Sequence, residues 1–107
     1  MNQIPLQNDL LKEEIDNLIH SPARLKILAY LYVVDSADYV FLVHQTGLTW
    51  GNLATHLKKL EEAGYLEIEK TFIDKKPHSM VQMTEQGRNA FRDYKKTMQR
   101  VLDDLPD

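Results

Sequence analysis

The chain has 107 residues, which favours a single domain over residues 1–107 with room for one modest core. Hydrophobic residues make up 43% of it and charged residues 27%, a balance typical of a folded globular protein. The absence of cysteine excludes disulfides, thiolate metal sites and a cysteine nucleophile. No apolar run approaches the ~18 residues of a membrane span, and the polar, acidic start does not resemble a secretory signal, so we expect a cytoplasmic protein.

The net charge of −3 argues mildly against nucleic-acid binding, because phosphate contacts need lysine and arginine. The distribution of charge is more informative than the sum. Residues 1–48 carry three basic and six acidic groups, whereas residues 49–78 carry five of each. The acidity therefore lies in the N-terminal part, and the lysines of the middle part form two pairs, at 58–59 and 75–76.

The first half of the chain predicts three helices. Apolar residues recur at helical spacing over residues 8–19 and indicate an N-terminal helix. Ser21 suits an N-cap and Pro22 suits the first helical position, so a second helix should begin there, apolar enough to be central. A short third helix is expected from Asp35 to Gly47, because glycine is a typical C-terminal stop.

A fourth helix follows a short turn. Thr49 is a good N-cap, and Leu53, Leu57 and Leu60 lie at helical spacing and define a buried stripe. Gly64 should end this helix. The first turn is unusual, because it places a large aromatic residue and a glycine next to each other in the order "TWGN". An exposed tryptophan here would indicate a contact residue, whereas a buried one would indicate packing against the neighbouring helix.

The hydrophobic pattern then changes from helical to alternating. Leu66, Ile68 and Phe72 should lie on one face of a half-buried strand, with Glu67 and Glu69 on the other. A polar turn and a second alternating stretch follow. Together these segments predict a two-stranded hairpin.

The second strand and the last helix complete the chain. Pro77 belongs to the polar turn, and Val81 with Met83 should form the inward pair of the second strand. Thr84 is the expected N-cap of a long helix over residues 85–104. Its apolar residues are spaced by three and four, which is typical of a narrow packing seam. They are Phe91, Tyr94, Met98, Val101, Leu102 and Leu105.

The order of elements describes a mostly helical α+β fold. The two helices joined by "TGLT" form a helix-turn-helix, and a hairpin directly after the second helix makes it a winged helix. We therefore expect a winged-helix core over residues 22–83, with the N-terminal helix over 8–19 and the C-terminal helix over 85–104 at its ends.

Three stretches resemble the MarR/ArsR-type winged-helix transcriptional regulators, and more narrowly the small regulators called winged helix DNA-binding domains. They are "IHSPARLKILAYL", "GLTWGNLATHLKKLEEAGYLEIEKTF" and "MTEQGRNAFRDY", and the resemblance covers roughly residues 18–96. It implies sequence-specific binding to double-stranded DNA as a homodimer. The helix over 49–63 would be the recognition helix in the major groove, and the hairpin over 66–83 would be the wing on the flanking backbone or minor groove.

The resemblance also assigns the site residues. The expected DNA-facing residues are Thr49, Trp50, Asn52, Thr55, His56, Lys58, Lys59, Lys75 and Lys76. Asparagine suits adenine, whereas the lysines would position the protein on phosphates without reading sequence. The first and last helices would form the dimer, with the interface at Leu11, Ile15, Phe91, Tyr94, Met98, Val101 and Leu102. The sequence departs from the family in its lysine-only wing tip, "DKKP", and in Trp50, which leaves the operator sequence open.

Other interpretations of these residues stay open. Lys58 and Lys59 precede Glu61 and Glu62, so they also fit a solvated, salt-bridged helix face. The net acidity and Trp50 fit a winged-helix protein–protein interaction module with weak or no DNA binding.

Catalytic, metal and cofactor sites find little support. The four histidines lack the spacing of a metal site, and no nucleophile–base pair or phosphate loop is visible, so we expect no enzyme, no metal and no cofactor. Phe91, Tyr94 and Met98 could line an effector pocket, but their spacing is more typical of packing, and no residue pattern identifies an effector.

Overall fold

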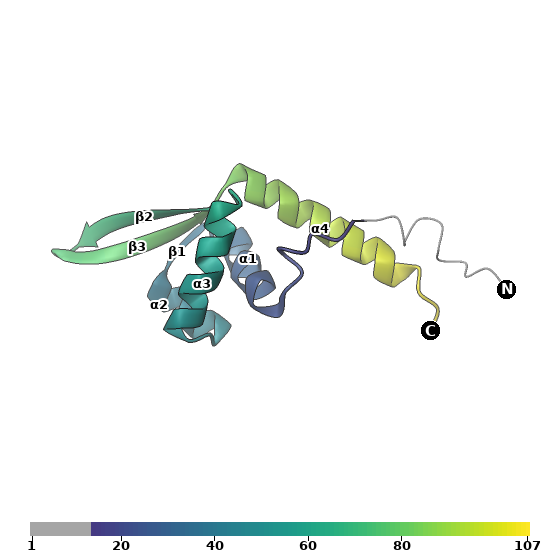
Figure 1. The fold of residues 1–107 in the computed structure, drawn as a ribbon, viewed down its shortest axis with the longest axis horizontal. Coiled ribbons are helices and arrows are strands. Elements are labelled where there is room, and N and C mark those ends of the chain that lie inside the picture. Colours follow the sequence, from purple (N-terminus) through teal and green to yellow (C-terminus); the bar gives the residue numbers. More distant parts are fainter. Residues whose placement is uncertain (1–13) are drawn as a thin grey trace.

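The computed structural model describes residues 14–107 as four helices and a three-stranded sheet. In chain order the elements are α1 (Pro22–Val34), β1 (Ser36–Asp38), α2 (Tyr39–Thr46), α3 (Trp50–Glu62), β2 (Leu66–Ile73), β3 (Lys76–Met83) and α4 (Glu85–Asp103). Helices α1, α2 and α3 gather at the root of the β2–β3 hairpin, which projects to one side while α4 extends to the other (Figure 1). This is the mostly helical winged-helix architecture that the sequence predicts.

Local capping residues set where the helices begin, as predicted. The side chains of Ser21, Thr49 and Thr84 each accept a hydrogen bond from the backbone N–H three residues later, at the starts of α1, α3 and α4. Two helices stop near a glycine in the left-handed region. Gly47 (φ 73°) caps α2, and Gly64 (φ 83°) lies just beyond α3.

An apolar core joins the helices to the sheet. The predicted stripe of α3, Leu53, Leu57 and Leu60, is fully buried. The predicted inward pair of β3 is buried too, with Val81 fully and Met83 almost fully enclosed. Burying one such side chain contributes about 1.5–3 kcal/mol, so this stripe fixes the rotation of α3 about its axis. The other fully buried large side chains are Ile19, Ile27, Leu28, Leu31, Leu42 and Leu66.

The predicted N-terminal helix is wrong over its described part. Residues 14–16 have no regular structure and 17–19 form a turn, while residues 8–13 lie outside the described part of the chain. Local side-chain bonds replace the helix. Asp16 Oδ1 accepts the backbone N–H groups of Leu18 and Ile19, and Arg24 Nε donates to the Leu18 carbonyl. This lead-in segment, residues 14–20, still buries Ile19 in the core.

The predicted third helix begins later than expected. Ser36–Asp38 form the strand β1, which pairs antiparallel with β3, so the sheet order is β1-β3-β2 rather than a two-stranded hairpin alone. Asp38 then caps α2 by accepting the N–H of Phe41. Strand formation here depends on the open edge of β3, a long-range partner that the local sequence does not reveal.

The hairpin is longer and tighter than predicted. Its strands run to Ile73 and from Lys76, and the two-residue turn between them places both Asp74 (φ 52°) and Lys75 (φ 65°) in the left-handed region. Phe72 was expected to face the core but is 72% exposed, because the hairpin extends beyond the helices (Figure 1). The core face of the strand is therefore buried only at its root, at Leu66 and Ile68.

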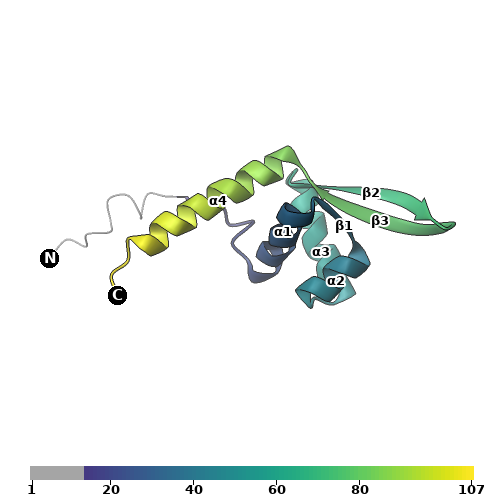
Figure 2. The same ribbon diagram turned by 180° about the vertical axis from the view of Figure 1, so that it is seen from behind.

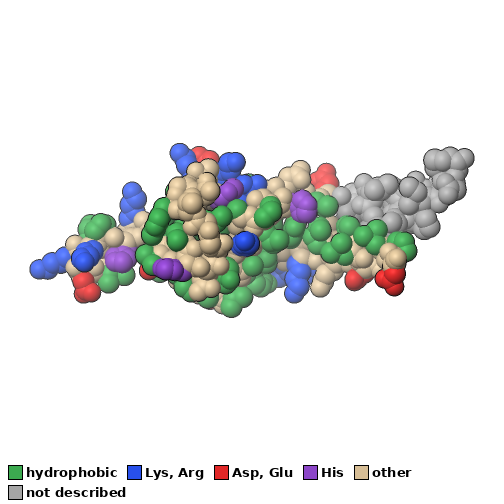
Figure 3. Space-filling model, turned by 90° about the horizontal axis from the view of Figure 1, so that it is seen from below, with side chains coloured by type: hydrophobic (Ala, Val, Ile, Leu, Met, Phe, Trp, Pro, Cys, Tyr) green, Lys and Arg blue, Asp and Glu red, His purple; other side chains and the backbone are tan. Residues whose placement is uncertain are grey.

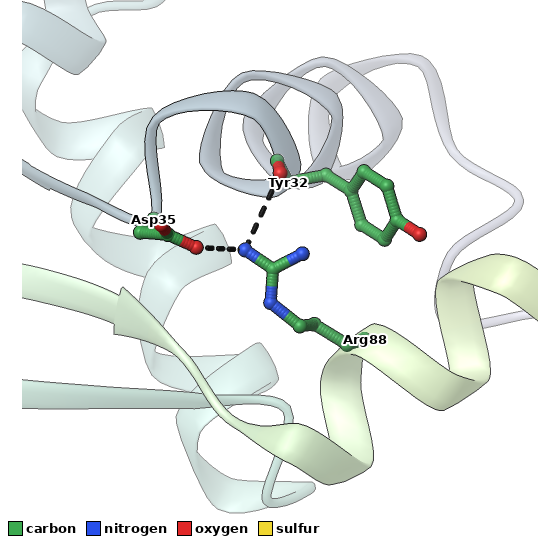
Figure 4. Close-up of polar contacts among 3 residues, drawn as sticks. All are labelled: Tyr32, Asp35 and Arg88. Carbon is green, nitrogen blue, oxygen red and sulfur yellow. Dashed lines mark hydrogen bonds and ion pairs between the residues drawn. The ribbon is translucent and has the colours of Figure 1, made fainter.

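The side chain of Arg88 links α4 to the C-terminal end of α1. Arg88 donates to the Asp35 carboxylate and to the Tyr32 carbonyl, and its guanidinium lies 4.8 Å from the centre of the Tyr32 ring (Figure 4). Asp35 is the C-cap of α1, with φ 69°. The Arg88 cation therefore lies at the C-terminal end of α1, where the helix dipole is negative. The hydrogen bonds of the Arg88 side chain also fix the orientation of α4 relative to α1.

A glycine allows α4 to approach the chain between α3 and β2. A Cβ on Gly87 would lie 2.2 Å from the carbonyl oxygen of Tyr65, so only glycine fits at this position. The same carbonyl accepts the backbone N–H of Thr84 at 3.0 Å. The first turn of α4 is therefore held directly against the base of the wing.

Candidate nucleic-acid interface

The outer face of α3 carries the polar residues predicted to contact DNA. The buried stripe turns Asn52, Thr55, Lys58 and Lys59 to solvent, and all four are exposed. Thr49 is also exposed, and its Oγ1 accepts the N–H of Asn52 at 3.1 Å. Its hydroxyl is therefore already used as the helix cap, whereas the side chain of Asn52 is free of any such role.

Trp50 combines the two arrangements that the sequence left open. Its side chain is 55% exposed, yet its ring stacks on that of Tyr39, with ring centres 6.5 Å apart and planes 22° from parallel. Tyr39 begins α2, so the stacked pair bridges the two helices of the helix-turn-helix. An aromatic surface held rigidly in this way loses little conformational freedom when a partner binds.

Gly51 leaves the first turn of α3 open to close approach. A Cβ built at this position would meet no atom within 4 Å, so packing does not require glycine here. Thr55 Oγ1 donates to the Gly51 carbonyl at 3.0 Å and steadies this turn. The backbone N–H groups at the start of a helix have no helical acceptors and suit an anion.

His56 is held by an arginine that sequence reasoning did not assign to the site. Arg24 of α1 places a guanidinium nitrogen 3.1 Å from His56 Nδ1. Arginine can only donate, so Nδ1 is the acceptor and the proton of the neutral ring lies on Nε2. The pKa of His56 is below its ordinary value, because of partial burial and then the charges of Arg24 and Lys59. This position therefore favours a neutral ring beside the charge of Arg24.

The wing adds lysines to the same side of the molecule. Lys75 and Lys76 are exposed at its turn, as predicted. Lys70 of β2, absent from the prediction, lines a cleft of about 310 Å³ together with Lys58 of α3. Strand alternation could have identified Lys70, because it shares the face of Leu66 and Ile68 but lies past the end of the core.

The acidic residues of the hairpin lie near its root. Glu67 and Glu69 are exposed on the face opposite Leu66 and Ile68 and line a cleft with Glu61 of α3, whereas Lys76 lies at the tip of that same face. Basic and hydrophobic side chains occur together at the projecting end of the hairpin (Figure 3). Glu61 near the C-terminal end of α3 lines the same cleft as Lys58 and Lys70, so the cleft itself has mixed charge.

The predicted dimer residues have different environments in the single chain. Tyr94 is only 8% exposed and accepts or donates a hydrogen bond with His20 Nδ1 at 2.8 Å, so it belongs mainly to its own core. Ile15, Phe91 and Met98 are partly buried against that core. Val101 is half-buried, Leu102 is 58% exposed, and Leu11 lies outside the described residues.

An apolar groove runs between α1 and α4. It measures about 340 Å³ and is lined by Leu25, Phe91, Tyr94, Met98 and Leu102, among others. The C-terminal part of α4 extends past α1 and α3 in both ribbon views (Figures 1 and 2). Within residues 14–107, no other helix or strand covers the apolar side chains at this end of α4.

Residues 14–107 contain no group of three or more histidine and acidic side chains arranged to hold a metal ion. Among the helices of the same part of the chain, none has both the length and the apolar character that a bilayer span requires.

Sequence comparisons identify relatives along most of the chain. The family model described as "Winged helix DNA-binding domain" matches residues 23–102. An uncharacterised protein of Methanocaldococcus jannaschii is 40% identical over 77 residues, which are 72% of this chain and 84% of that protein.

Solved structures show the same architecture. A transcriptional regulator homologue from Pyrococcus horikoshii OT3 superposes with a TM-score of 0.80 and 25% identity, covering 95% of this chain and 100% of that one. A MarR-family regulator from Silicibacter pomeroyi shares the fold at a TM-score of 0.63 and 23% identity, covering 80% of this chain and 57% of that one. These are folds of transcriptional regulators rather than of enzymes. The chain thus belongs to the winged helix DNA-binding domain family and has the MarR-type regulator fold.

Proposed function

We propose that this protein is a sequence-specific DNA-binding transcriptional regulator that acts as a homodimer. In this proposal α3 enters the major groove and the β2–β3 wing contacts the flanking backbone or minor groove. Asn52 and Thr55 would read base edges, and Lys58, Lys59, Lys75 and Lys76 would contact phosphates. Trp50 and His56 would border this surface at the two sides of α3.

The observation that supports DNA binding most strongly is the arrangement of charge around α3 and the wing. Lys70 extends the basic surface of α3 toward the wing tip, while Glu67 and Glu69 lie on the opposite face of the hairpin. The net charge of −3 therefore does not describe this face. A solved neighbour with 19% identity, reduced AbfR, was determined bound to DNA, which is compatible with such a role for the fold.

The homodimer is supported by the uncovered apolar end of α4. Leu102 near the end of α4 is 58% exposed, and Leu105 just beyond the helix is 46% exposed, so two neighbouring leucines leave apolar area in water. A second copy packed along this seam would cover them. Two recognition helices would then be presented about one DNA turn apart, ~34 Å, to a palindromic site.

Lysine variants test the DNA interface directly. Lys59→Ala and Lys76→Ala should each weaken binding to a fragment of the neighbouring promoter region and reduce the salt dependence by about one phosphate contact. Gel shifts at several salt concentrations measure both effects. Lys96→Ala, an exposed lysine of α4, is the matched control and should bind as the wild type. Equal binding by all three variants would contradict the proposed interface.

A protein–protein interaction module is the second candidate, and the exposed Trp50 stacked on the partly buried Tyr39 is the observation that favours it. Val40, which follows Tyr39 in the chain, is 48% exposed. Such an aromatic surface suits a binding hot spot. If Trp50→Ala abolished capture of a protein partner while the wild type failed to shift promoter DNA, this second function would replace the first.

A further inference from the structure

The free end of the wing carries an apolar pair that the fold does not use. Phe72 is 72% exposed, and the register of the hairpin places it directly opposite Pro77, which is also exposed. Residues opposite each other on neighbouring strands have their side chains on the same face. An exposed phenylalanine costs solubility and leaves a large apolar area in water, so this pair suits contact with a partner.

The register shows which face of the wing holds the pair. Ile68 pairs with Val81, Lys70 with Ser79 and Phe72 with Pro77. These three pairs occupy every second position, so their side chains share one face of the hairpin. Val81 is fully buried, so this is the face that packs against the helices at the root. Phe72 and Pro77 therefore continue, beyond the core, the face on which α3 lies.

Charge indicates what kind of partner this face takes. Lys70 lies on the same face between the core and the apolar pair, and Lys75 lies in the adjoining turn. Lys76 pairs with Ile73 on the opposite face of the tip. Asp74 is the one acidic residue between Lys70 and His78. The apolar pair thus has Lys70 beside it on its own face and Lys75 in the adjoining turn, and Lys70 connects it to Lys58 of α3. These cations favour an anionic partner over an apolar protein surface.

We propose that Phe72 and Pro77 form an apolar wedge that enters the DNA minor groove beside the site of α3, with Lys70, Lys75 and Lys76 on the bordering phosphates. This inference rests on the proposed DNA-binding function. Phenylalanine and proline are among the side chains that minor-groove proteins place against sugars and between base steps. A wedge of this kind selects DNA by groove width and deformability, so flexible pyrimidine–purine steps should be favoured in the flank.

The test compares two adjacent exposed residues on opposite faces of the wing. Phe72→Ala removes the wedge, whereas Ile73→Ala removes a 47% exposed apolar side chain from the other face and is the matched control. Full-length variants are titrated with promoter DNA over a range of salt concentrations, and hydroxyl-radical footprints are taken on the complexes. Hydroxyl radicals report sugar protection in the minor groove.

Phe72→Ala should weaken binding about tenfold, as expected for losing a partly buried aromatic contact. Its salt slope should be unchanged, because no phosphate contact is lost. The footprint should lose protection in the flanking minor groove, while Ile73→Ala behaves as the wild type and Phe72→Leu restores most of the affinity.

Three outcomes bear on the wedge and the proposed function. If Phe72→Ala and Ile73→Ala both bound promoter DNA as tightly as the wild type, the wedge would be overturned while the DNA-binding function would stand. If the wild type itself bound no promoter DNA, the proposed function would fail and the wedge with it. Loss of a protein complex in Phe72→Ala, with DNA binding unaltered, would assign the pair to a protein partner and overturn the wedge.

Discussion

At the scale of single residues, the first turn of α3 combines a cap, an aromatic bridge and an open glycine. Thr49 fixes the start of the helix, and Trp50 packs on Tyr39 while keeping half of its surface exposed. Gly51 has no packing reason to be glycine. Because Gly51 lowers helix stability and does not improve packing, its role is best explained by a binding partner that approaches the backbone of this turn.

Gly51→Ala separates stability from binding. Alanine is favoured over glycine within helices by up to about 1 kcal/mol, and the space for its Cβ is open, so thermal unfolding should show an unchanged or raised midpoint. DNA affinity should nevertheless fall, because the methyl group keeps phosphate away from the backbone N–H groups. Unchanged affinity would show that the backbone of this turn makes no close contact.

The sequence predicts some of these residues better than others. Ser21, Thr49 and Thr84 are caps whose partners lie three residues away, so short segments reveal them. Arg24 contacts His56 across 32 positions, and no local pattern records that approach. The exposure of Trp50 could not be predicted either, because the environment of its ring depends on where α2 places Tyr39.

At the scale of elements, the lead-in segment connects the two ends of the fold. Tyr65 at the base of the wing donates to Asp16 Oδ2 at 2.5 Å, and His20 bonds Tyr94 of α4 at 2.8 Å. The pattern over residues 8–19 predicted a helix here. The described part is instead a turn, because the side chains of Asp16 and Arg24 take the backbone groups that a helix would use.

Alkaline pH should weaken the Tyr65–Asp16 contact. Burial, followed by the hydrogen bond to Asp16 and its charge, raises the pKa of Tyr65 from 10.0 to about 12. The folded pKa lies above the unfolded one, so this stabilisation is fully present below pH 10.0 and is lost as pH rises toward and through about 12.

The change is measured by chemical denaturation of the wild type and of Tyr65→Phe between neutral pH and pH 12. Burial also raises the pKa of Tyr39 and Tyr94, but both proteins keep these groups, so the difference between them isolates Tyr65. The wild type should be more stable near neutral pH, and its advantage should shrink above pH 10. A constant difference would contradict the contact.

At the scale of the whole molecule, the helices α1 to α4 and the strands β2 and β3 were predictable, but their extents beyond the core were not. The hairpin and α4 both extend past the three-helix body, one on each side (Figure 1). Alternation marked Phe72 as inward, and only the position of the core shows that this face is open there. The same holds for α4, whose seam is buried at Tyr94 and exposed at Leu102.

Disrupting the exposed part of this seam should separate the proposed dimer without unfolding the chain. Leu102→Asp changes a 58% exposed residue, so the folded monomer should lose little stability, whereas a charge buried between two copies is strongly unfavourable. Sedimentation velocity at micromolar concentration should give a dimer for the wild type and for the surface control Lys96→Glu, and a monomer for Leu102→Asp. A monomeric wild type would contradict the homodimer.

The central claim is that an acidic chain binds DNA through a locally basic face. Equilibrium titration of a labelled promoter fragment with the wild-type protein, repeated across salt concentrations, tests it most directly. The logarithm of the binding constant should fall linearly with the logarithm of salt concentration, with a slope that corresponds to several phosphate contacts. Binding that did not change with salt, or no binding at low salt, would contradict the claim.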